Sequence, residues 1–143
     1  MVNDNSNIQG LRQSFTRDEY VSPEVFDHEM QEIFAKRWNF VGRSEQLAHI
    51  GDRLVVEVGN ESILIVRNRE GELRAYYNVC QHRGSQLCDK SGSGFGAAIT
   101  CPYHSWSYSL EGKLVSAIHH DKESFDRDSI SLTPVRVDEW QGN

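Results

Sequence analysis

Two short segments of the chain each offer one cysteine and one histidine. Cys80 and His82 are two positions apart, Cys101 and His104 are three apart, and eighteen residues separate the two pairs. Thiolates and imidazoles are common side-chain ligands of transition metals. Both segments also contain residues typical of turns, so we expect two loops that meet around a metal. This requirement constrains the fold more than any other feature of the sequence.

A Rieske [2Fe–2S] cluster needs this set of ligands, because two cysteines hold one of its irons and two histidines hold the other. Each loop would supply one ligand to each iron. Neutral imidazoles lower the negative charge around the cluster, which raises the reduction potential to about −150 to +300 mV, against about −400 mV for plant-type ferredoxins. We therefore expect Cys80, His82, Cys101 and His104 to bind a cluster that accepts electrons and passes them on.

A tetrahedral zinc site is the alternative, because two cysteines and two histidines are also a common zinc ligand set. Zinc modules usually place both cysteines first and both histidines later. Here each pair mixes a cysteine with a histidine, and the first pair is separated by a single residue. This order favours the iron–sulfur cluster over zinc.

Residues 78–110 closely resemble the Rieske domain of the Rieske non-haem iron oxygenases, which include the α subunits of aromatic-ring hydroxylases. That family carries N-x-C-x-H-R-G in the first loop and C-P-Y-H-G-W-x-Y in the second. The matching residues here are Asn78, Cys80, His82, Arg83, Gly84, Cys101, Pro102, Tyr103, His104, Trp106 and Tyr108. Ser105 replaces the usual glycine, and serine would add strain of about 1 kcal/mol if that position needs a positive φ.

The resemblance implies an oxidoreductase component that delivers electrons. Oxygenase α subunits of the family are much longer and bind a mononuclear Fe(II) in a second domain, and no His-x₄-His pair of the kind they use occurs in these 143 residues. We therefore expect the catalytic iron only in a domain outside this chain, and no turnover of substrate by the chain alone. By resemblance, the pathway would be aromatic hydrocarbon catabolism by a dioxygenase.

The same resemblance implies the partners. A ferredoxin or a flavin reductase would donate electrons, and the catalytic domain of a neighbouring α subunit in a trimer would accept them. A free-standing Rieske ferredoxin is the competing interpretation, but such proteins usually begin directly with a strand, whereas this chain opens with a polar arm and a helical pattern. A zinc-stabilised interaction module is the third possibility.

Charge and apolar content exclude other classes. The net charge of −6 argues against a nucleic-acid partner. The first twenty residues lack the apolar run of a signal peptide, and no later segment approaches the length of a membrane span, so we expect a cytoplasmic protein. Of the three cysteines, Cys88 is left over, and we expect it to be a free thiol near the first loop.

An amphipathic helix is predicted over residues 23–37. Ser22 is suited to cap it, and Pro23 to occupy its first position. Apolar residues then recur with helical spacing at Val25, Phe26, Met30, Ile33, Phe34 and Trp38. We assign residues 1–38 to a polar arm and this helix, which in similar oxygenases lies against the catalytic domain.

From residue 39 onward the pattern predicts a mainly β fold. Segments rich in β-branched and aromatic residues, separated by turn residues, are 40–43, 53–58, 62–67, 73–77, 97–100, 106–110 and 113–117. We expect a small antiparallel sandwich or barrel over residues 39–118, with the two cluster-binding loops at one end. Trp106 and Tyr108 should pack beneath the cluster, and residues 91–96 should form a flexible connection between the loops.

Residues 119–143 are predicted to be a tail that leads into a catalytic domain absent from this chain. His119, His120 and Asp121 form a superficially metal-like group, but adjacent residues rarely share one ion, so we expect an exposed turn there. Alternation returns at residues 134–137 and predicts one more strand. We expect the tail to leave an apolar edge incompletely covered and prone to self-association.

Overall fold

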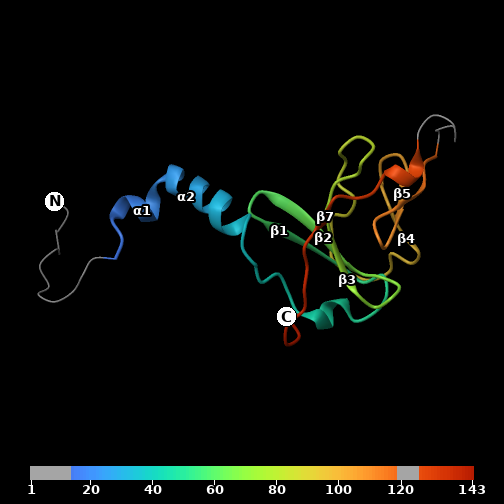
Figure 1. Ribbon diagram of the computed structural model, residues 1–143, viewed down its shortest axis with the longest axis horizontal. Helices are drawn as coiled ribbons and strands as arrows, with labels where there is room; N and C mark the ends of the chain where they lie inside the picture. The colour runs from blue at the N-terminus through green and yellow to red at the C-terminus, as the bar shows by residue number, and fades with distance from the viewer. Residues whose placement is uncertain (1–13, 119–125) are drawn as a thin grey trace, which may run out of the picture. The chain divides into compact units, whose positions relative to one another are not determined.

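A computed structural model describes residues 14–118 and 126–143 (Figure 1). The chain divides into two compact units, Met1–Trp38 and Asn39–Asn143. The turn expected at His119, His120 and Asp121 lies outside the described residues. Within the described part, no helix combines the length and the apolar composition needed to cross a bilayer.

The N-terminal unit is helical, as predicted, but it is built from three short pieces. These are α1 (Arg17–Val21), α2 (Pro23–Glu29) and the π-helical turn η1 (Met30–Phe34). Ser22 caps α2 as expected, and its hydroxyl accepts a hydrogen bond from the backbone N–H of Val25 at 3.3 Å. The sequence interpretation missed α1, although Thr16 and Glu19 form a capping box at its start.

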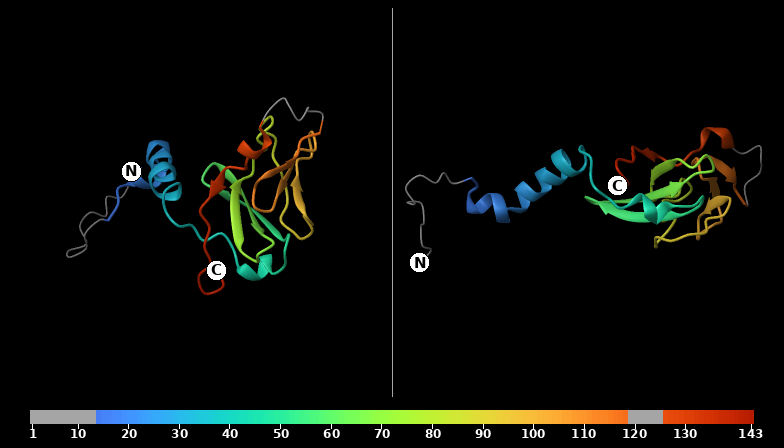
Figure 2. Two further views of the ribbon diagram at one scale, coloured as in Figure 1. Left: turned by 45° about the vertical axis from the view of Figure 1, so that its right-hand side comes forward. Right: turned by 90° about the horizontal axis from the view of Figure 1, so that it is seen from below.

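The second unit is an antiparallel β fold of two sheets, as predicted (Figures 1 and 2). The first sheet has the order β1-β2-β3-β7, and the second has the order β4-β5-β6. The strands of the first sheet are β1 (Arg53–Val58), β2 (Glu61–Arg67), β3 (Leu73–Tyr77) and β7 (Pro134–Val135). Those of the second are β4 (Ala98–Thr100), β5 (Ser107–Ser109) and β6 (Leu114–Ser116).

The strand expected at residues 40–43 does not form, and that prediction was wrong. The backbone N–H of Arg43 donates instead to the side-chain carbonyl of Gln46 at 2.8 Å. The next backbone N–H, that of Ser44, donates to the carbonyl of Gly142 at 3.1 Å. These bonds start the 3₁₀ helix η2 (Ser44–Leu47), so the chain turns at this point instead of pairing along a sheet edge.

The central strand β2 is buried on both faces, and its side chains separate two parts of the core. Leu64 and Val66 belong to the larger cluster, which includes residues from both sheets. Ile63 and Ile65 point to the opposite face and pack with Leu47 of η2 in the smaller cluster. This alternation follows from the period of two in a β-strand.

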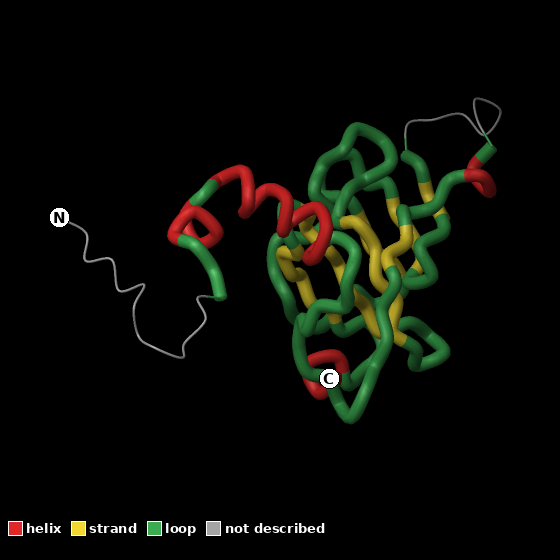
Figure 3. Tube along the Cα trace, turned by 60° about the vertical axis from the view of Figure 1, so that its left-hand side comes forward, coloured by secondary structure: helices red, strands yellow, loops and turns green. Residues whose placement is uncertain are grey.

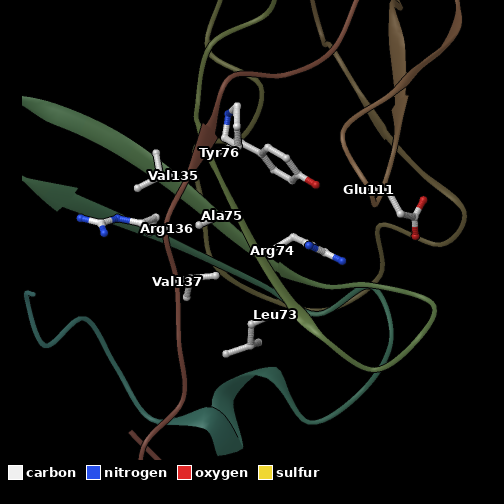
Figure 4. Close-up of a pocket in the computed structure, with 9 residues that line it drawn as sticks. Leu73, Arg74, Ala75, Tyr76, Glu111, Val135, Arg136 and Val137 are labelled. Atoms are coloured by element: carbon white, nitrogen blue, oxygen red, sulfur yellow. The ribbon is translucent and has the colours of Figure 1, made fainter. Parts of the chain in front are cut away.

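Tyr76 connects the two sheets. Its ring extends from β3 toward the turn that carries Glu111 (Figure 4), and its hydroxyl donates to the carbonyl of Leu110 at 3.0 Å. Gly112 lies under this ring, since a Cβ atom there would come within 2.6 Å of Cε1 of Tyr76. Gly112 also has a φ of +83°, so glycine is needed at this turn for two reasons.

The described part of the tail packs within the second unit. The strand predicted at residues 134–137 forms as the shorter β7, and it pairs with β3 through Ala75 and Val135. Leu132 is only 2% exposed and belongs to the larger core cluster. Figure 3 shows the C-terminus beside a short helix, in agreement with the hydrogen bond from Ser44 of η2 to Gly142. That the tail leads into a catalytic domain stays a prediction.

Candidate metal centre

The first candidate loop follows β3 and closes through two backbone hydrogen bonds. The N–H of Cys80 donates to the carbonyl of Ser85 at 2.8 Å, and the N–H of Gly84 donates back to the carbonyl of Cys80 at 3.0 Å. Gly84 has a φ of +69°, the left-handed conformation that glycine adopts without strain. This tight turn presents the side chains of Cys80 and His82.

The second candidate loop, between β4 and β5, repeats the same turn. The N–H of Cys101 donates to the carbonyl of Trp106 at 2.8 Å, and the N–H of Ser105 donates to the carbonyl of Cys101 at 3.1 Å. Ser105 has a φ of 57°, so it occupies the conformation of Gly84 in the first loop. The position does require a positive φ, and serine is strained there.

The two loops bring like ligands together. The imidazole rings of His82 and His104 have their centroids 4.9 Å apart. The thiols of Cys80 and Cys101 lie close enough to interact, and this interaction contributes to the raised pKa of Cys80. The side chains predicted from the sequence therefore meet as a cysteine pair and a histidine pair.

No group of three or more His, Cys, Asp or Glu side chains that could hold one metal ion occurs within residues 14–118 and 126–143. A cluster of the Rieske type places no such demand on the protein, because each of its irons takes only two protein ligands. The four side chains lie in the two pairs that such a cluster would use.

The surroundings of these side chains fit a metal cluster. Cys80 and Cys101 are each 2% exposed within the larger core cluster. Nδ1 of His104 is buried and makes no hydrogen bond with any described residue. A buried polar atom without a partner is costly, and coordination to a metal would remove that cost.

Protonation of the cysteines bears on metal binding. Burial raises the pKa of the Cys80 thiol, and the contact with Cys101 adds to this effect. Hydrogen bonds from the Tyr108 hydroxyl and from the backbone of His82 act in the opposite direction. Since metal ligands must be thiolates, cluster binding would release the thiol protons, and the two hydrogen bonds would stabilise the sulfur that remains.

Tyr108 has a more specific position than the sequence predicted. Its hydroxyl accepts a hydrogen bond from the backbone N–H of Gln81 at 3.0 Å and lies 3.3 Å from Sγ of Cys80. Burial raises the pKa of this phenol, so the hydroxyl keeps its proton and can donate it to a cysteine thiolate. Sequence reasoning placed Tyr108 beneath the cluster but missed this contact, which joins β5 to the first loop.

Aromatic contacts hold the histidines. The indole of Trp106 is stacked on the ring of His82, with centroids 4.6 Å apart and planes 10° from parallel. The ring of Tyr103 lies 3.7 Å from that of His104. Trp106 is 5% exposed and Tyr103 is 61% exposed, so the first packs inside and the second lies at the surface. His82 and His104 are half-buried, whereas Cys80 and Cys101 are buried, so the histidine pair is closer to solvent.

Other candidate side chains have different contacts. Cys88 is half-buried, and its Sγ accepts a hydrogen bond from Nε of Arg53 at 3.1 Å. His28 is exposed, and the side chain of His49 is 87% exposed beside Asp52. A groove of about 410 Å³ beside β3 and β7 (Figure 4) is lined by nine residues, none of them cysteine or histidine.

Comparison with protein families matches residues 37–133 to the Rieske [2Fe-2S] domain. A curated relative is the carnitine monooxygenase oxygenase subunit of Acinetobacter baumannii, which is 43% identical over 130 residues. The match covers 90% of this chain and 35% of that protein, so the chain spans about a third of the length of this relative.

Solved structures give the same result. One of them is the quaternary ammonium Rieske monooxygenase CntA in complex with its substrate L-carnitine, which is 43% identical with a TM-score of 0.83. The match covers 90% of this chain and 36% of the CntA chain. Naphthalene 1,2-dioxygenase with indole bound is 31% identical, with a TM-score of 0.75. That match covers 83% of this chain and 27% of the dioxygenase chain. Both likenesses confirm the predicted fold.

Proposed function

The chain belongs to the Rieske [2Fe–2S] domain family, and on this premise we propose that it is the electron-delivering portion of a Rieske non-haem iron oxygenase. One observation carries the proposal. Two turns of the same shape bring Cys80 against Cys101 and His82 against His104, as a cluster with two different irons requires. The relatives, which are oxygenase subunits, favour this role over that of a free-standing ferredoxin.

In this proposal, Cys80 and Cys101 hold one iron, and His82 and His104 hold the other. When bound, the cluster supplies one-electron transfer. The two sides of the site differ in solvent exposure. The cysteines lie in the core, whereas the histidines are half-buried beside the exposed ring of Tyr103. Electrons would therefore leave at the histidine edge, where another subunit can approach.

We infer the class of substrate from the comparisons. Identity to the carnitine monooxygenase subunit is 43%, against 31% to naphthalene 1,2-dioxygenase. A monooxygenase that acts on a quaternary ammonium compound is therefore better supported than the ring-hydroxylating dioxygenase expected from the sequence. The catalytic mononuclear iron would belong to a domain outside this chain.

The partners follow from this role. We expect a reductase or ferredoxin to supply electrons, and the catalytic domain of a neighbouring subunit to receive them. The N-terminal helices carry exposed apolar side chains, among them Phe26 and Ile33, which suits packing against such a domain. The cytoplasmic location stays a prediction of the sequence.

Metal analysis tests the central proposal. The chain, purified without oxygen, should contain iron and acid-labile sulfide in equal amounts and little zinc, and dithionite should produce the EPR signal of a reduced Rieske cluster. Cys101→Ser should abolish this signal. Cys88→Ser is the matched control and should preserve it, because Cys88 is not one of the four ligands and a serine hydroxyl can accept the Arg53 hydrogen bond in place of Sγ. Stoichiometric zinc without sulfide would establish the zinc module instead.

The substrate class needs a separate assay. An oxygenase that carries this chain, supplied with a reductase, should consume oxygen faster when L-carnitine is added and show no response to naphthalene. The opposite pattern would restore the aromatic-ring hydroxylase, without affecting the assignment of the cluster.

A further inference from the structure

A buried asparagine joins the two ends of the first ligand loop. Asn78 is 1% exposed and lies two residues before Cys80. Its Oδ1 accepts a hydrogen bond from the backbone N–H of Cys88 at 3.0 Å, and its Nδ2 donates to the carbonyl of Cys88 at 2.6 Å. A single side chain therefore pairs with both backbone polar groups at the far end of the loop.

Asn78 is also bound to the first sheet. Its backbone N–H donates to the carbonyl of Ser62 at 2.9 Å, and its Nδ2 lies 3.3 Å from the hydroxyl of Ser62. Ser62 belongs to β2, which is paired with β1 on one side and β3 on the other. A strand paired on both edges is a rigid support, so Asn78 connects this support to both ends of the loop.

Cys88 is held from a second direction by Arg53 of β1. Nε of Arg53 donates to Sγ of Cys88 at 3.1 Å and to the carbonyl of Lys90 at 3.0 Å. Its Nη1 donates to the carbonyl of Ser93 at 2.8 Å, and its guanidinium lies 4.6 Å from the centre of the Phe95 ring. The connection predicted to be flexible is therefore fastened to β1, and Cys88 is a fixed point.

We propose that Asn78 is a positioning residue for the cluster, with Cys88 as its anchor. By holding Cys88 against β2, the Asn78 amide sets the direction in which Cys80 and His82 face the second loop. This inference rests on the proposed function. The proposal also gives Cys88 a role that requires neither metal ligation nor a disulfide.

Asn78 can position the loop because it satisfies backbone polar groups of Cys88 that would otherwise have no hydrogen-bond partner. Without the Asn78 amide, the N–H and the carbonyl of Cys88 would lose their partners in a half-buried place. Such groups recover hydrogen bonds only if the loop moves toward water. Movement at the ends of the loop would displace Cys80 and His82, which lie inside the same short loop.

Asn68 offers a matched control within the same unit. It is 0% exposed, and its Oδ1 accepts a hydrogen bond from the backbone N–H of Glu72 at 2.7 Å. It closes the turn between β2 and β3, which carries none of the four ligands. Asn68→Ala and Asn78→Ala should therefore cost similar stability, and only the second should affect the cluster.

The experiment compares the full chain with both variants after loading with iron and sulfide. In Asn78→Ala, we expect the EPR g values and the reduction potential to shift, and a chelator to remove iron about tenfold faster, the factor given by about 1.4 kcal/mol of lost hydrogen bonding. In Asn68→Ala, all three measurements should match the unmodified chain. If Asn78→Ala does not fold, Ser62→Ala, which removes one contact of the amide, should shift the same measurements by a smaller amount.

The outcomes are distinct. If Asn78→Ala and Ser62→Ala both keep the unmodified g values, potential and iron release, Asn78 is only a structural residue and the inference fails while the proposed function stands. A shift of equal size in Asn68→Ala would also overturn it. If the unmodified chain shows no Rieske signal, the proposed function fails, and the inference fails with it.

Discussion

At the scale of single residues, Ser105 shows how a local conflict is tolerated at a functional turn. It occupies the left-handed conformation that Gly84 occupies in the first loop. A residue with a Cβ atom is strained there by about 1–2 kcal/mol. The neighbouring hydrogen bonds of Cys101 keep the turn closed in spite of this strain.

Ser105→Gly should therefore stabilise the folded chain by about 0.5–1 kcal/mol, after allowance for the greater freedom of glycine in the unfolded state. Thermal unfolding of the cluster-loaded protein would measure the gain. Ser105→Ala is the control, because it removes the hydroxyl but keeps the Cβ atom, and it should give no gain. Equal stability of the glycine variant and the natural chain would contradict the strain argument.

Tyr108 supports a second prediction at this scale. A hydroxyl that donates to a cysteine ligand stabilises the added negative charge of the reduced cluster, so it raises the potential. Tyr108→Phe should lower the reduction potential by roughly 50 mV, because a one-electron couple moves by about 59 mV for 1.4 kcal/mol. Tyr77→Phe should leave the potential unchanged, because the Tyr77 ring packs against the smaller core cluster and Cys80 belongs to the larger one. An unchanged potential in Tyr108→Phe would show that the hydroxyl does not donate to the sulfur.

At the scale of the elements, the two sheets are joined by Tyr76 over the turn between β5 and β6. Burial raises the pKa of Tyr76 to about 12, while a tyrosine in the unfolded chain ionises near pH 10. As the pH rises above about 10, the unfolded state loses this proton first, so unfolding becomes easier until the pH passes about 12.

Tyr76→Phe should cost about 1–2 kcal/mol at neutral pH, because the carbonyl of Leu110 loses its donor in a buried place. The phenylalanine variant has no phenol to ionise, so its deficit should shrink as the pH rises from about 10 toward 12. Denaturant titrations of both proteins over this range would measure the difference. A deficit that stays constant at all pH values would exclude a protonated, buried phenol as its cause.

At the scale of the whole molecule, unburied apolar side chains are concentrated in the N-terminal unit. None of the residues of α1, α2 or η1 is buried, and the side chains of Phe26, Ile33 and Trp38 are 55%, 48% and 68% exposed. The tail residue Val135, by contrast, pairs with β3, and Leu132 is in the core. The self-association expected of the tail stays a prediction, since Trp140 in the tail is also 72% exposed, and the helices offer a second apolar surface for it.

Light scattering after size-exclusion chromatography should show the chain as oligomers at high concentration, because exposed apolar patches associate. Replacing both Phe26 and Ile33 by serine should shift the mass toward the monomer. Asp27→Ser alters an exposed polar residue of the same helix and should have no such effect. A natural chain that is monomeric at every concentration would refute this prediction.

The sequence by itself determined the chemistry of the centre and most of the strands. Cysteine and histidine identities, their spacing, and the alternation in β1, β2 and β3 are properties of short segments, and short segments can be interpreted without knowing what they contact. For the same reason, the capping of α2 by Ser22 was predictable. The failed strand at residues 40–43 had the right alternation, but Gln46 and Gly142 took its backbone hydrogen bonds.

Only the tertiary structure decided which distant side chains support the ligands. Cys80 and Tyr108 are 28 positions apart, and Arg53 and Cys88 are 35 apart. The sequence also could not show that Asn78 pairs with the backbone of Cys88. Contacts between distant positions depend on how two sheets pack and on which polar groups are left inside, and no local pattern of residue types records that.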